Sequence, residues 1–337
     1  MARKVFRHYD RQALDREYNN RAKVPDHGDW LARYPRESAA ARAERPVRLD
    51  VAYGSHPGET LDVFPASGPG PAPIQIFVHG GYWQWLDKGD FSFVARALGS
   101  AGAAVVVINY ALIPSVGMDE LVRQCRAAVA WTSRHATSFG GDPHRIYVSG
   151  HSAGGHLVAM LMATDWKAFG VPADVIKGGT GISGLYDLEP IRLSYLNDVL
   201  KLSPAEARRN SPLHLAPPPS GRLLLAVGGD EGPEYHRQTD DLAAAWRQQG
   251  LACEVMDLPG INHFSIIAQL EDPKSELSRA ILGQTERAAL PRPRGARAPS
   301  RARTARPARP SAGAGSRRRA PRGRKAGKAS GRRRRRG

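Results

Sequence analysis

Short runs of apolar, largely β-branched residues recur along the middle of the chain, and polar segments separate them. Continuous apolar runs of this length are typical of strands that are buried on both faces of a sheet. An earlier pair of runs is separated by the turn residues 54–58, as in a β-hairpin. The predicted strands are residues 47–53, 60–64, 74–79, 103–109, 145–149, 175–182, 222–228 and 253–258.

Helical patterns alternate with most of these strands. Leu121, Cys125 and Val129 recur every four positions, which places one apolar stripe of a helix against a sheet. Eight strands led by an antiparallel pair, with helices between most of them, predict a mostly parallel α/β sheet with helices on both faces. The predicted helices are residues 91–98, 119–135, 153–164, 234–249 and 264–282.

The same pattern divides the chain into parts. Residues 1–46 are polar and charged, with a helical stretch at 9–20 and then a segment interrupted by Pro and Gly. We expect them to form an arm that lies over a core built from residues 47–285. Within that domain, residues 185–219 break the alternation with short helical pieces and many prolines, which indicates an inserted cap above the strand ends.

The net charge of +17 is concentrated at the C-terminal end of the 337-residue chain. Residues 291–337 hold 19 Lys and Arg and no Asp or Glu, so the first 290 residues, with 30 basic against 32 acidic, are nearly neutral. The tail has almost no large apolar residue to offset the entropy of ordering, and we predict that it is disordered. Its arginines are suited to non-specific contact with nucleic acid or another polyanion, although it has no aromatic residue for base stacking.

Two cysteines at unrelated positions form neither a disulfide framework nor a metal motif, which favours a reducing compartment. The N-terminus runs from basic residues into further charge, without the apolar segment of a secretory signal. The longest apolar run, residues 101–112, is far too short to cross a bilayer. We therefore expect a cytoplasmic protein without a membrane partner, and the pattern predicts nothing about its oligomeric state.

The segment Gly150-His151-Ser152-Ala153-Gly154 lies between a predicted strand and a predicted helix. A Gly-x-Ser-x-Gly pattern in that context forms a sharp turn that raises the serine hydroxyl above the end of a sheet. Ser152 is therefore the candidate nucleophile. A serine needs an imidazole to take its proton and a carboxylate to orient that imidazole.

The partners of Ser152 should follow it in the order acid and then histidine, each after a strand. Of the 11 histidines, only His263 lies beyond the last predicted strand. The acid should follow the strand at 222–228, where Asp230 and Glu231 are adjacent candidates. Glu231 stands third after the glycine that ends this strand, as is common in similar folds. Asp230 remains the alternative, because Asp is the commoner residue in that role.

A second glycine-rich turn, His79-Gly80-Gly81-Tyr82-Trp83, ends another predicted strand. Glycines let the backbone approach a negatively charged oxygen closely. The N–H groups of Gly81, Tyr82 and Ala153 are therefore candidates for an oxyanion hole. His79 is expected to orient this loop rather than to act as a second base.

Two further histidines, His151 and His156, flank the serine turn. They lack the spacing of a zinc motif and an accompanying set of carboxylates, so we predict neither a metal nor another cofactor. A serine, an acid and a histidine in this order, together with an oxyanion loop, predict a serine hydrolase of the α/β-hydrolase fold.

Five segments carry a likeness to a known family: Tyr18-Asn19-Asn20-Arg21-Ala22-Lys23-Val24-Pro25, His79-Gly80-Gly81-Tyr82-Trp83-Gln84, Gly150-His151-Ser152-Ala153-Gly154-Gly155-His156-Leu157, Glu234-Tyr235-His236-Arg237-Gln238-Thr239 and Asn262-His263-Phe264. They resemble the arylformamidase (kynurenine formamidase) branch of the α/β hydrolases, over about residues 18–282. The resemblance implies a small-molecule substrate, with hydrolysis of N-formyl-L-kynurenine to L-kynurenine and formate in tryptophan breakdown. It also supports Glu231, because the acid of that branch stands three residues before the Glu of the fourth segment.

An aryl substrate would need an apolar wall beside the nucleophile. We expect this wall from four aromatic residues near the predicted motifs: Tyr82, Trp83, Trp85 and Tyr186.

Three other functions fit parts of the sequence. The same nucleophile and base would serve a carboxylesterase that acts on small acyl esters. The basic tail fits a protein associated with nucleic acid, and a binding module that kept the fold without catalysis is a third alternative. The presence of Ser152, His263 and an acid argues against that third alternative.

Overall fold

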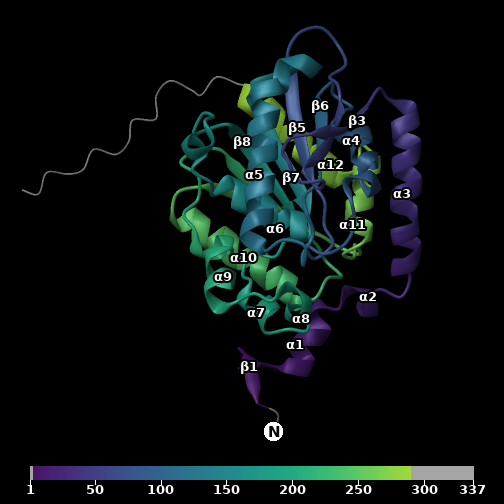
Figure 1. Ribbon diagram of the computed structural model, residues 1–337. Coiled ribbons are helices and arrows are strands. Elements are labelled where there is room, and N and C mark those ends of the chain that lie inside the picture. Colours follow the sequence, from purple (N-terminus) through teal and green to yellow (C-terminus); the bar gives the residue numbers. More distant parts are fainter. Residues whose placement is uncertain (1–2, 290–337) are drawn as a thin grey trace, which may run out of the picture. The chain divides into compact units, whose positions relative to one another are not determined.

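An eight-stranded sheet forms the centre of the computed structural model, which describes residues 3–289 (Figure 1). Its strands are β3 (Arg48–Ala52), β4 (Thr60–Phe64), β5 (Ala72–Val78), β6 (Ala104–Ile108), β7 (Gly141–His151), β8 (Ile176–Ile182), β9 (Arg222–Gly228) and β10 (Ala252–Leu258). They lie in the order β10-β9-β8-β7-β5-β6-β4-β3. Neighbouring strands are parallel except where β4 pairs with β3 and β6. The predicted mostly parallel eight-stranded sheet is confirmed.

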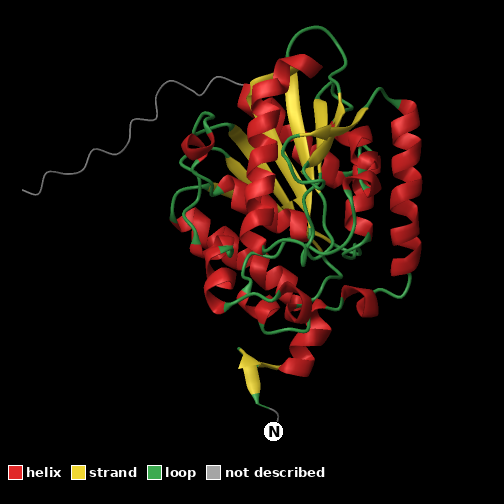
Figure 2. Cartoon of the chain, viewed as in Figure 1, coloured by secondary structure: helices red, strands yellow, loops and turns green. Residues whose placement is uncertain are grey.

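Helices cover both faces of this sheet (Figure 2). The apolar cluster on one face includes side chains of α5 (Met118–His135), α6 (Ala153–Met162) and α10 (Pro233–Gln248). The cluster on the other face includes side chains of α4 (Ala95–Leu98) and α12 (Glu276–Ala289). The central strands are apolar along their whole length because both of their faces are covered, as the fully buried sequence Ala-Val-Val-Val-Ile of β6 illustrates.

The N-terminal arm is more regular than its polar sequence indicates. It contains a hairpin and three helices: β1 (Lys4–Phe6), β2 (Tyr9–Asp10), α1 (Arg11–Tyr18), α2 (Asn20–Lys23) and α3 (His27–Glu44). The expectation of an interrupted segment is wrong for α3, which continues through Pro35. Tyr34 and Ala41 lie on one stripe of α3 and pack into the second apolar cluster. Their burial outweighs the helical hydrogen bond that the proline removes.

The predicted helix at 264–282 is divided in the structure. α11 (Ser265–Ala268) runs into a 3₁₀ turn at Gln269–Glu271, and α12 begins only at Glu276. Between them, Asp272 is extended at φ −114° and ψ 117°. The ring of a proline clashes with a helical conformation at the residue before it, so Pro273 explains why a single helix is wrong here.

The predicted helix at 91–98 is also shorter than expected. Two 3₁₀ turns, at Lys88–Asp90 and Ser92–Val94, precede α4. Phe91 separates these turns at φ −122° and ψ 10°, which leaves the dihedral angles of a continuous helix.

Residues 185–219 contain the short helical pieces that their sequence predicts. These are α7 (Glu189–Arg192), α8 (Asn197–Leu200) and α9 (Pro204–Arg209). The segment contacts the arm, because the backbone N–H of Tyr195 donates to Asp15 Oδ1 at 2.7 Å. Figure 1 shows α7, α8 and α9 on the same side of the molecule as α1. That this segment acts as a cap stays a prediction.

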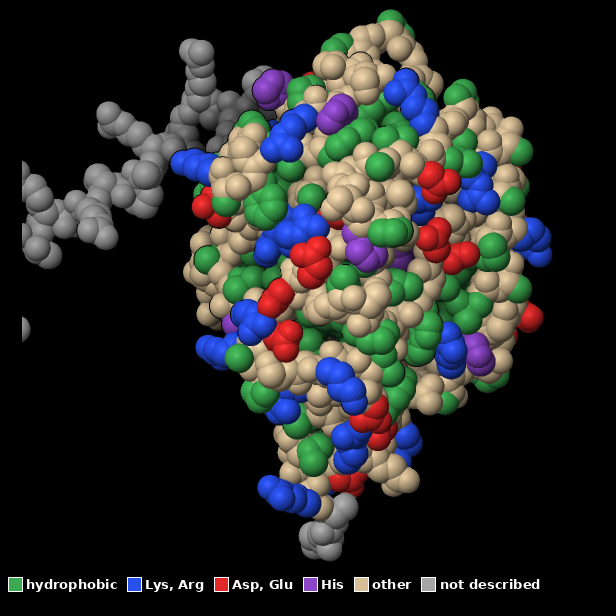
Figure 3. Space-filling model, in the orientation of Figure 1, with side chains coloured by type: hydrophobic (Ala, Val, Ile, Leu, Met, Phe, Trp, Pro, Cys, Tyr) green, Lys and Arg blue, Asp and Glu red, His purple; other side chains and the backbone are tan. Residues whose placement is uncertain are grey.

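The predicted disordered tail, residues 291–337, and the polyanion contact assigned to it lie outside the described residues. On the face drawn in Figure 3, basic and acidic side chains are interspersed, in keeping with the nearly neutral composition of the first 290 residues. Within residues 3–289, no helix combines the length and the apolar character that a membrane crossing requires.

Replacing Leu14 with Ala should lower the free energy of unfolding by about 2–4 kcal/mol, because a fully buried leucine leaves a cavity when it is truncated. Leu49→Ala is the matched control. Its side chain is 49% exposed, and its loss should cost less than about 0.5 kcal/mol. Urea unfolding of both variants measures the difference. If Leu14→Ala lowered the free energy of unfolding as little as Leu49→Ala does, α1 would not unfold together with the domain.

Candidate active site

Ser152 occupies a strained turn between β7 and α6. Its φ of 57° and ψ of −116° are unusual for a residue with a side chain, and its N–H donates to Ile182 O at 2.8 Å. A Cβ on Gly154 would overlap Val78 O, which explains the glycine after the serine. The turn thus holds the hydroxyl above the carboxyl edge of the sheet, as the Gly-x-Ser-x-Gly pattern predicts.

The structure brings Ser152, His263 and Glu231 together in one hydrogen-bonded chain. His263 Nε2 lies 3.1 Å from Ser152 Oγ, and His263 Nδ1 lies 2.6 Å from Glu231 Oε2. The side chains of His263 and Glu231 are only 7% and 1% exposed, so little water competes for these contacts. A proton on Nδ1 satisfies the carboxylate and leaves Nε2 as the acceptor that faces the serine. The arrangement is chemically able to take a proton from Ser152.

Of the two adjacent carboxylates, Glu231 contacts His263. Glu231 Oε1 accepts hydrogen bonds from the Gly228 N–H at 2.8 Å and from the Ser183 hydroxyl at 2.5 Å, while its other oxygen faces His263. Asp230 is exposed to solvent. Ser183 was not among the sequence candidates, since its only signal is its place directly after β8.

The glycine-rich loop after β5 approaches the serine closely. A Cβ on Gly80 would lie 2.8 Å from His151 O and 3.1 Å from Ser152 Cβ. Gly81 and Tyr82 follow with positive φ values of 110° and 48°. No acceptor within residues 3–289 contacts their N–H groups. These donors therefore remain free for a ligand.

Ala153 contributes a third N–H to this region. It is the first residue of α6, where the N–H groups have no partner within the helix and carry the positive end of the helix dipole. N–H groups of the glycine-rich loop and of the first turn of α6 are thus available beside Ser152, and their role as an oxyanion hole stays a prediction.

His79 holds the loop rather than contacting the serine. Its ring stacks on Tyr110 with centroids 4.3 Å apart and contacts Gly80 O and Asn109 Oδ1. Burial lowers the pKa of His79. The expectation that His79 orients the loop agrees with these contacts.

The two histidines beside the nucleophile are engaged by protein atoms. His151 Nε2 lies 2.9 Å from His263 O, and burial holds the pKa of His151 well below its usual value. His156 Nδ1 accepts from the Trp83 indole N–H at 3.1 Å, while His156 Nε2 donates to Asn210 O at 2.7 Å. His156 thereby ties the glycine-rich loop to the segment at 185–219.

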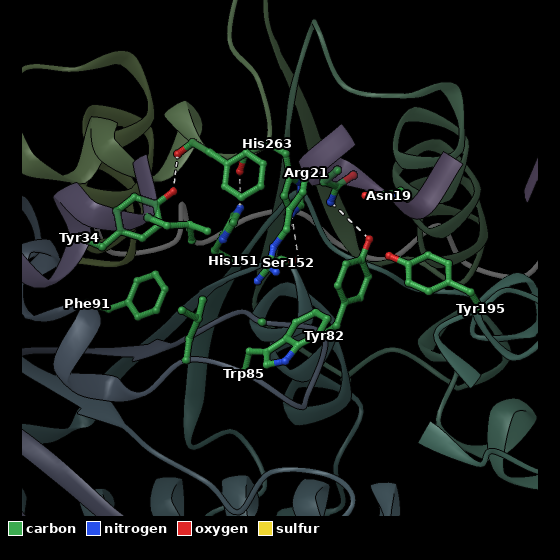
Figure 4. A pocket seen from close by; sticks show the side chains of 15 residues that line it. Asn19, Arg21, Tyr34, Tyr82, Trp85, Phe91, His151, Ser152, Tyr195 and His263 are labelled. Atoms are coloured by element: carbon green, nitrogen blue, oxygen red, sulfur yellow. Dashed lines mark hydrogen bonds between the residues drawn. The ribbon is translucent and has the colours of Figure 1, made fainter. Parts of the chain in front are cut away.

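A cavity of about 260 Å³ opens at Ser152 and His263. Figure 4 shows Tyr34 and Phe91 on one side of it, and Asn19 and Tyr195 on the other. The cavity is lined by Asn19, Asn20, Arg21, Leu31, Tyr34, Gly81, Tyr82, Trp85, Leu86, Phe91, His151, Ser152, Tyr195, His263 and Phe264.

The aromatic wall differs from the one expected. Tyr82 and Trp85 line the cavity, whereas Trp83 and Tyr186 are fully buried in the core and do not. Trp83 turns away because its indole N–H finds its acceptor on His156. A Cβ on Gly184 would strike the Tyr186 ring, so this tyrosine fills the space beneath the turn after β8. Both expectations are corrected by the structure.

The arm supplies a third of the residues that line the cavity. The hydrophobic and polar pattern of the sequence did not indicate this role. Asn19, Asn20 and Arg21 come from the segment that resembles an N-terminal motif of the arylformamidases, and this likeness was the only available signal. Leu31 and Tyr34 come from α3, which was expected to be irregular. Tyr34 is fixed there by its hydroxyl, which donates to Phe264 O at 2.7 Å.

The fold should lose stability as the pH falls from about 7 towards 4. Burial lowers the pKa of His156 to about 4. The unfolded residue takes up a proton below about pH 6.5, whereas the folded one stays neutral until about pH 4. The stability that the neutral His156 ring contributes is fully present above the unfolded pKa. Below that pKa the free energy of unfolding falls progressively, by up to about 3 kcal/mol.

Urea unfolding between pH 7 and pH 5 tests this for the wild type and His156→Gln. The variant should depend less on pH over this range, although His79 and His151, whose pKa values burial also lowers, keep part of the slope. The same slope in both proteins would contradict the assignment to His156.

Comparison with known proteins gives this site its context. The family model BD-FAE matches residues 61–171. Kynurenine formamidase of Danio rerio is 37% identical over 248 residues, which are 72% of this chain and 83% of that protein. A crystal structure from Silicibacter, provisionally described as a thioesterase, is 31% identical with a TM-score of 0.71, and it covers 80% of this chain and 98% of its own.

An esterase of Pyrobaculum calidifontis shares the fold at 18% identity and a TM-score of 0.63, with coverage of 83% of this chain and 98% of its own. The match to the Danio rerio kynurenine formamidase spans most of both chains, at an identity well above what a shared fold alone produces. The protein is a hydrolase with the α/β-hydrolase fold, and it belongs to the kynurenine formamidase family.

Proposed function

We propose that this hydrolase is an arylformamidase that cleaves N-formyl-L-kynurenine to L-kynurenine and formate. The observation that carries the proposal is the chain from Ser152 Oγ through His263 to Glu231 at the base of a cavity with an aromatic side. The 37% identity to a kynurenine formamidase over most of both chains supports the substrate.

In this proposal Ser152 is the nucleophile, His263 the general base and Glu231 the acid of the triad. Ser152 Oγ attacks the formyl carbon while His263 Nε2 takes the hydroxyl proton. Glu231 stabilises the resulting imidazolium and keeps the ring in the required tautomer. The carbonyl oxygen becomes negative as the tetrahedral intermediate forms, and the N–H groups of Gly81, Tyr82 and Ala153 stabilise it.

Collapse of the intermediate breaks the C–N bond. The protonated His263 gives its proton to the leaving aryl amine, and the formyl group stays on Ser152 as an ester. Water then attacks this ester while His263 takes one of its protons. That proton returns to Ser152 as the C–O bond to the serine breaks, and formic acid leaves and ionises to formate by giving its proton to solvent. Each proton removed is returned, so the triad is restored after one turnover.

The cavity suits a small acyl group on a flat leaving group. Tyr34, Phe91 and Phe264 give one side apolar, aromatic surfaces on which an aryl ring can stack. A formyl group is the smallest acyl group, and it requires little room next to the close-packed loop at Gly80.

A carboxylesterase acting on small acyl esters is the second candidate. The same triad would cleave an ester, and the Silicibacter protein at 31% identity is provisionally described as a thioesterase. The two functions differ in the leaving group, because an anilide nitrogen needs protonation by His263 before it departs.

The comparison of two substrates separates these functions. We expect kcat/KM for N-formyl-L-kynurenine to exceed that for p-nitrophenyl acetate, because only the former uses both the aromatic side of the cavity and the acid step. Formate release and ester hydrolysis are measured on the same preparation. Cleavage of the ester alone would remove the formamidase proposal.

Replacing Glu231 with Gln should lower kcat by about 10³- to 10⁴-fold, the loss seen when the acid of a serine triad is neutralised. The amide keeps the size of the side chain but no longer stabilises the imidazolium. Asp230→Asn is the matched control and should stay within about 2-fold of the wild type, since Asp230 is exposed. The reverse ranking would assign the acid to Asp230.

A further inference from the structure

The cavity at Ser152 has one charged side chain apart from its histidines. Arg21 is the only Lys or Arg among the described residues that line it, and no Asp or Glu is among them. Within the described lining, the arm therefore contributes one positive charge to the cavity.

Arg21 has no acidic partner within residues 3–289. Two other basic residues of the arm have acidic partners: Lys23 pairs with Glu17 at 3.0 Å, and Arg33 pairs with Glu271 at 2.5 Å. A guanidinium without a carboxylate keeps all five N–H donors for water or for a ligand.

The position of Arg21 is set by Trp85. The guanidinium carbon lies 4.8 Å from the centroid of the Trp85 ring, in a cation–π contact. Trp85 is 40% exposed and also lines the cavity. Stacking on this ring reduces the conformational freedom that Arg21 would otherwise lose on binding a ligand.

Besides Trp85, the cavity has hydrogen-bonding side chains on the side where the charge of Arg21 acts. Asn19 and Tyr195 lie together on one side of the view in Figure 4, away from Tyr34 and Phe91. Burial raises the pKa of the Tyr195 phenol, and the positive charge of Arg21 partly opposes this rise. The charge of Arg21 therefore acts on this polar side of the cavity, and the opposite side is aromatic.

We propose that Arg21 binds a carboxylate of the substrate and so makes the enzyme selective for acyl amides whose aryl part also carries an anionic group. The inference rests on the proposed function, since it places the aryl ring on the aromatic side while the formyl group faces Ser152. A planar guanidinium binds a carboxylate through two parallel hydrogen bonds, which matches the carboxylate of an amino acid.

The test compares an anionic with a neutral formamide. Arg21→Ala should lower the ratio of kcat/KM for N-formyl-L-kynurenine over kcat/KM for N-formylaniline by about 10- to 100-fold, as expected when one charge-assisted contact is lost. Arg21→Lys keeps the charge without the planar fork, so its ratio of kcat/KM values should lie between those of the wild type and Arg21→Ala. Arg16→Ala is the control, because Arg16 is an exposed arginine of the same arm that does not line this cavity.

The outcomes separate this inference from the proposed function. If the wild type cleaves neither formamide, the formamidase proposal fails. If it cleaves both and Arg21→Ala lowers both by the same factor, the formamidase proposal stands and carboxylate recognition by Arg21 is refuted.

A second readout does not depend on formamide cleavage. L-Kynurenine and its methyl ester are compared as inhibitors of p-nitrophenyl acetate hydrolysis. In the wild type, the inhibition constant of L-kynurenine should be about 10-fold or more below that of the ester, and Arg21→Ala should abolish this difference. Equal inhibition of the wild type by both compounds would overturn the inference whichever reaction the enzyme catalyses.

Discussion

The imidazole of His263 can act as a base only if its two nitrogens face two different partners at once. One nitrogen must meet the Ser152 hydroxyl and the other must meet the Glu231 carboxylate. These residues follow different strands, so the loops that carry them have to be held in one relative position. Hydrogen bonds between the loops provide this, from Gly229 N–H to Leu258 O and from Asp230 N–H to Ile261 O. Asp230 thus contacts the His263 loop through its backbone, while Glu231 contacts His263 through its side chain.

The N-terminal arm depends on the same centre. Tyr235 follows the acid loop on α10, and its ring lies 4.8 Å from that of His263. Its hydroxyl receives a hydrogen bond from Asn20 Nδ2 at 2.7 Å and lies 2.9 Å from the hydroxyl of Tyr82. One buried polar network therefore connects the arm, the glycine-rich loop and the helix behind the triad. The arm completes the cavity because this network holds it against the site.

Sequence alone was sufficient for the features that depend on local pattern or on strand order. Continuous apolar runs predict buried strands whose carboxyl ends meet at one edge, and this places Ser152, His263 and a carboxylate at position 230 or 231 near one another. The preference for Glu231 over Asp230 rested on spacing and resemblance, since the sequence does not show which of two adjacent carboxylates is buried.

Features that depend on tertiary packing were missed. The stripe of α3 that includes Tyr34 outweighs Pro35, whereas Asp272, the residue before Pro273, is extended and the helix is divided there. Trp83 and Tyr186 have the right chemistry for a cavity wall, but composition does not say which side of a turn a ring occupies. Arg21 shows the converse case. A polar residue in a charged arm becomes part of a site only through long-range contacts that its own sequence does not encode.

Covalent labelling of the nucleophile tests the central claim most directly. The full chain is treated with diethyl p-nitrophenyl phosphate, which phosphorylates a serine only when a neighbouring imidazole has activated it. Peptide mass spectrometry should find one adduct, on the peptide that contains Ser152, and His263→Ala should prevent its formation. No adduct, or labelling at another residue with Ser152 unmodified, would contradict the account.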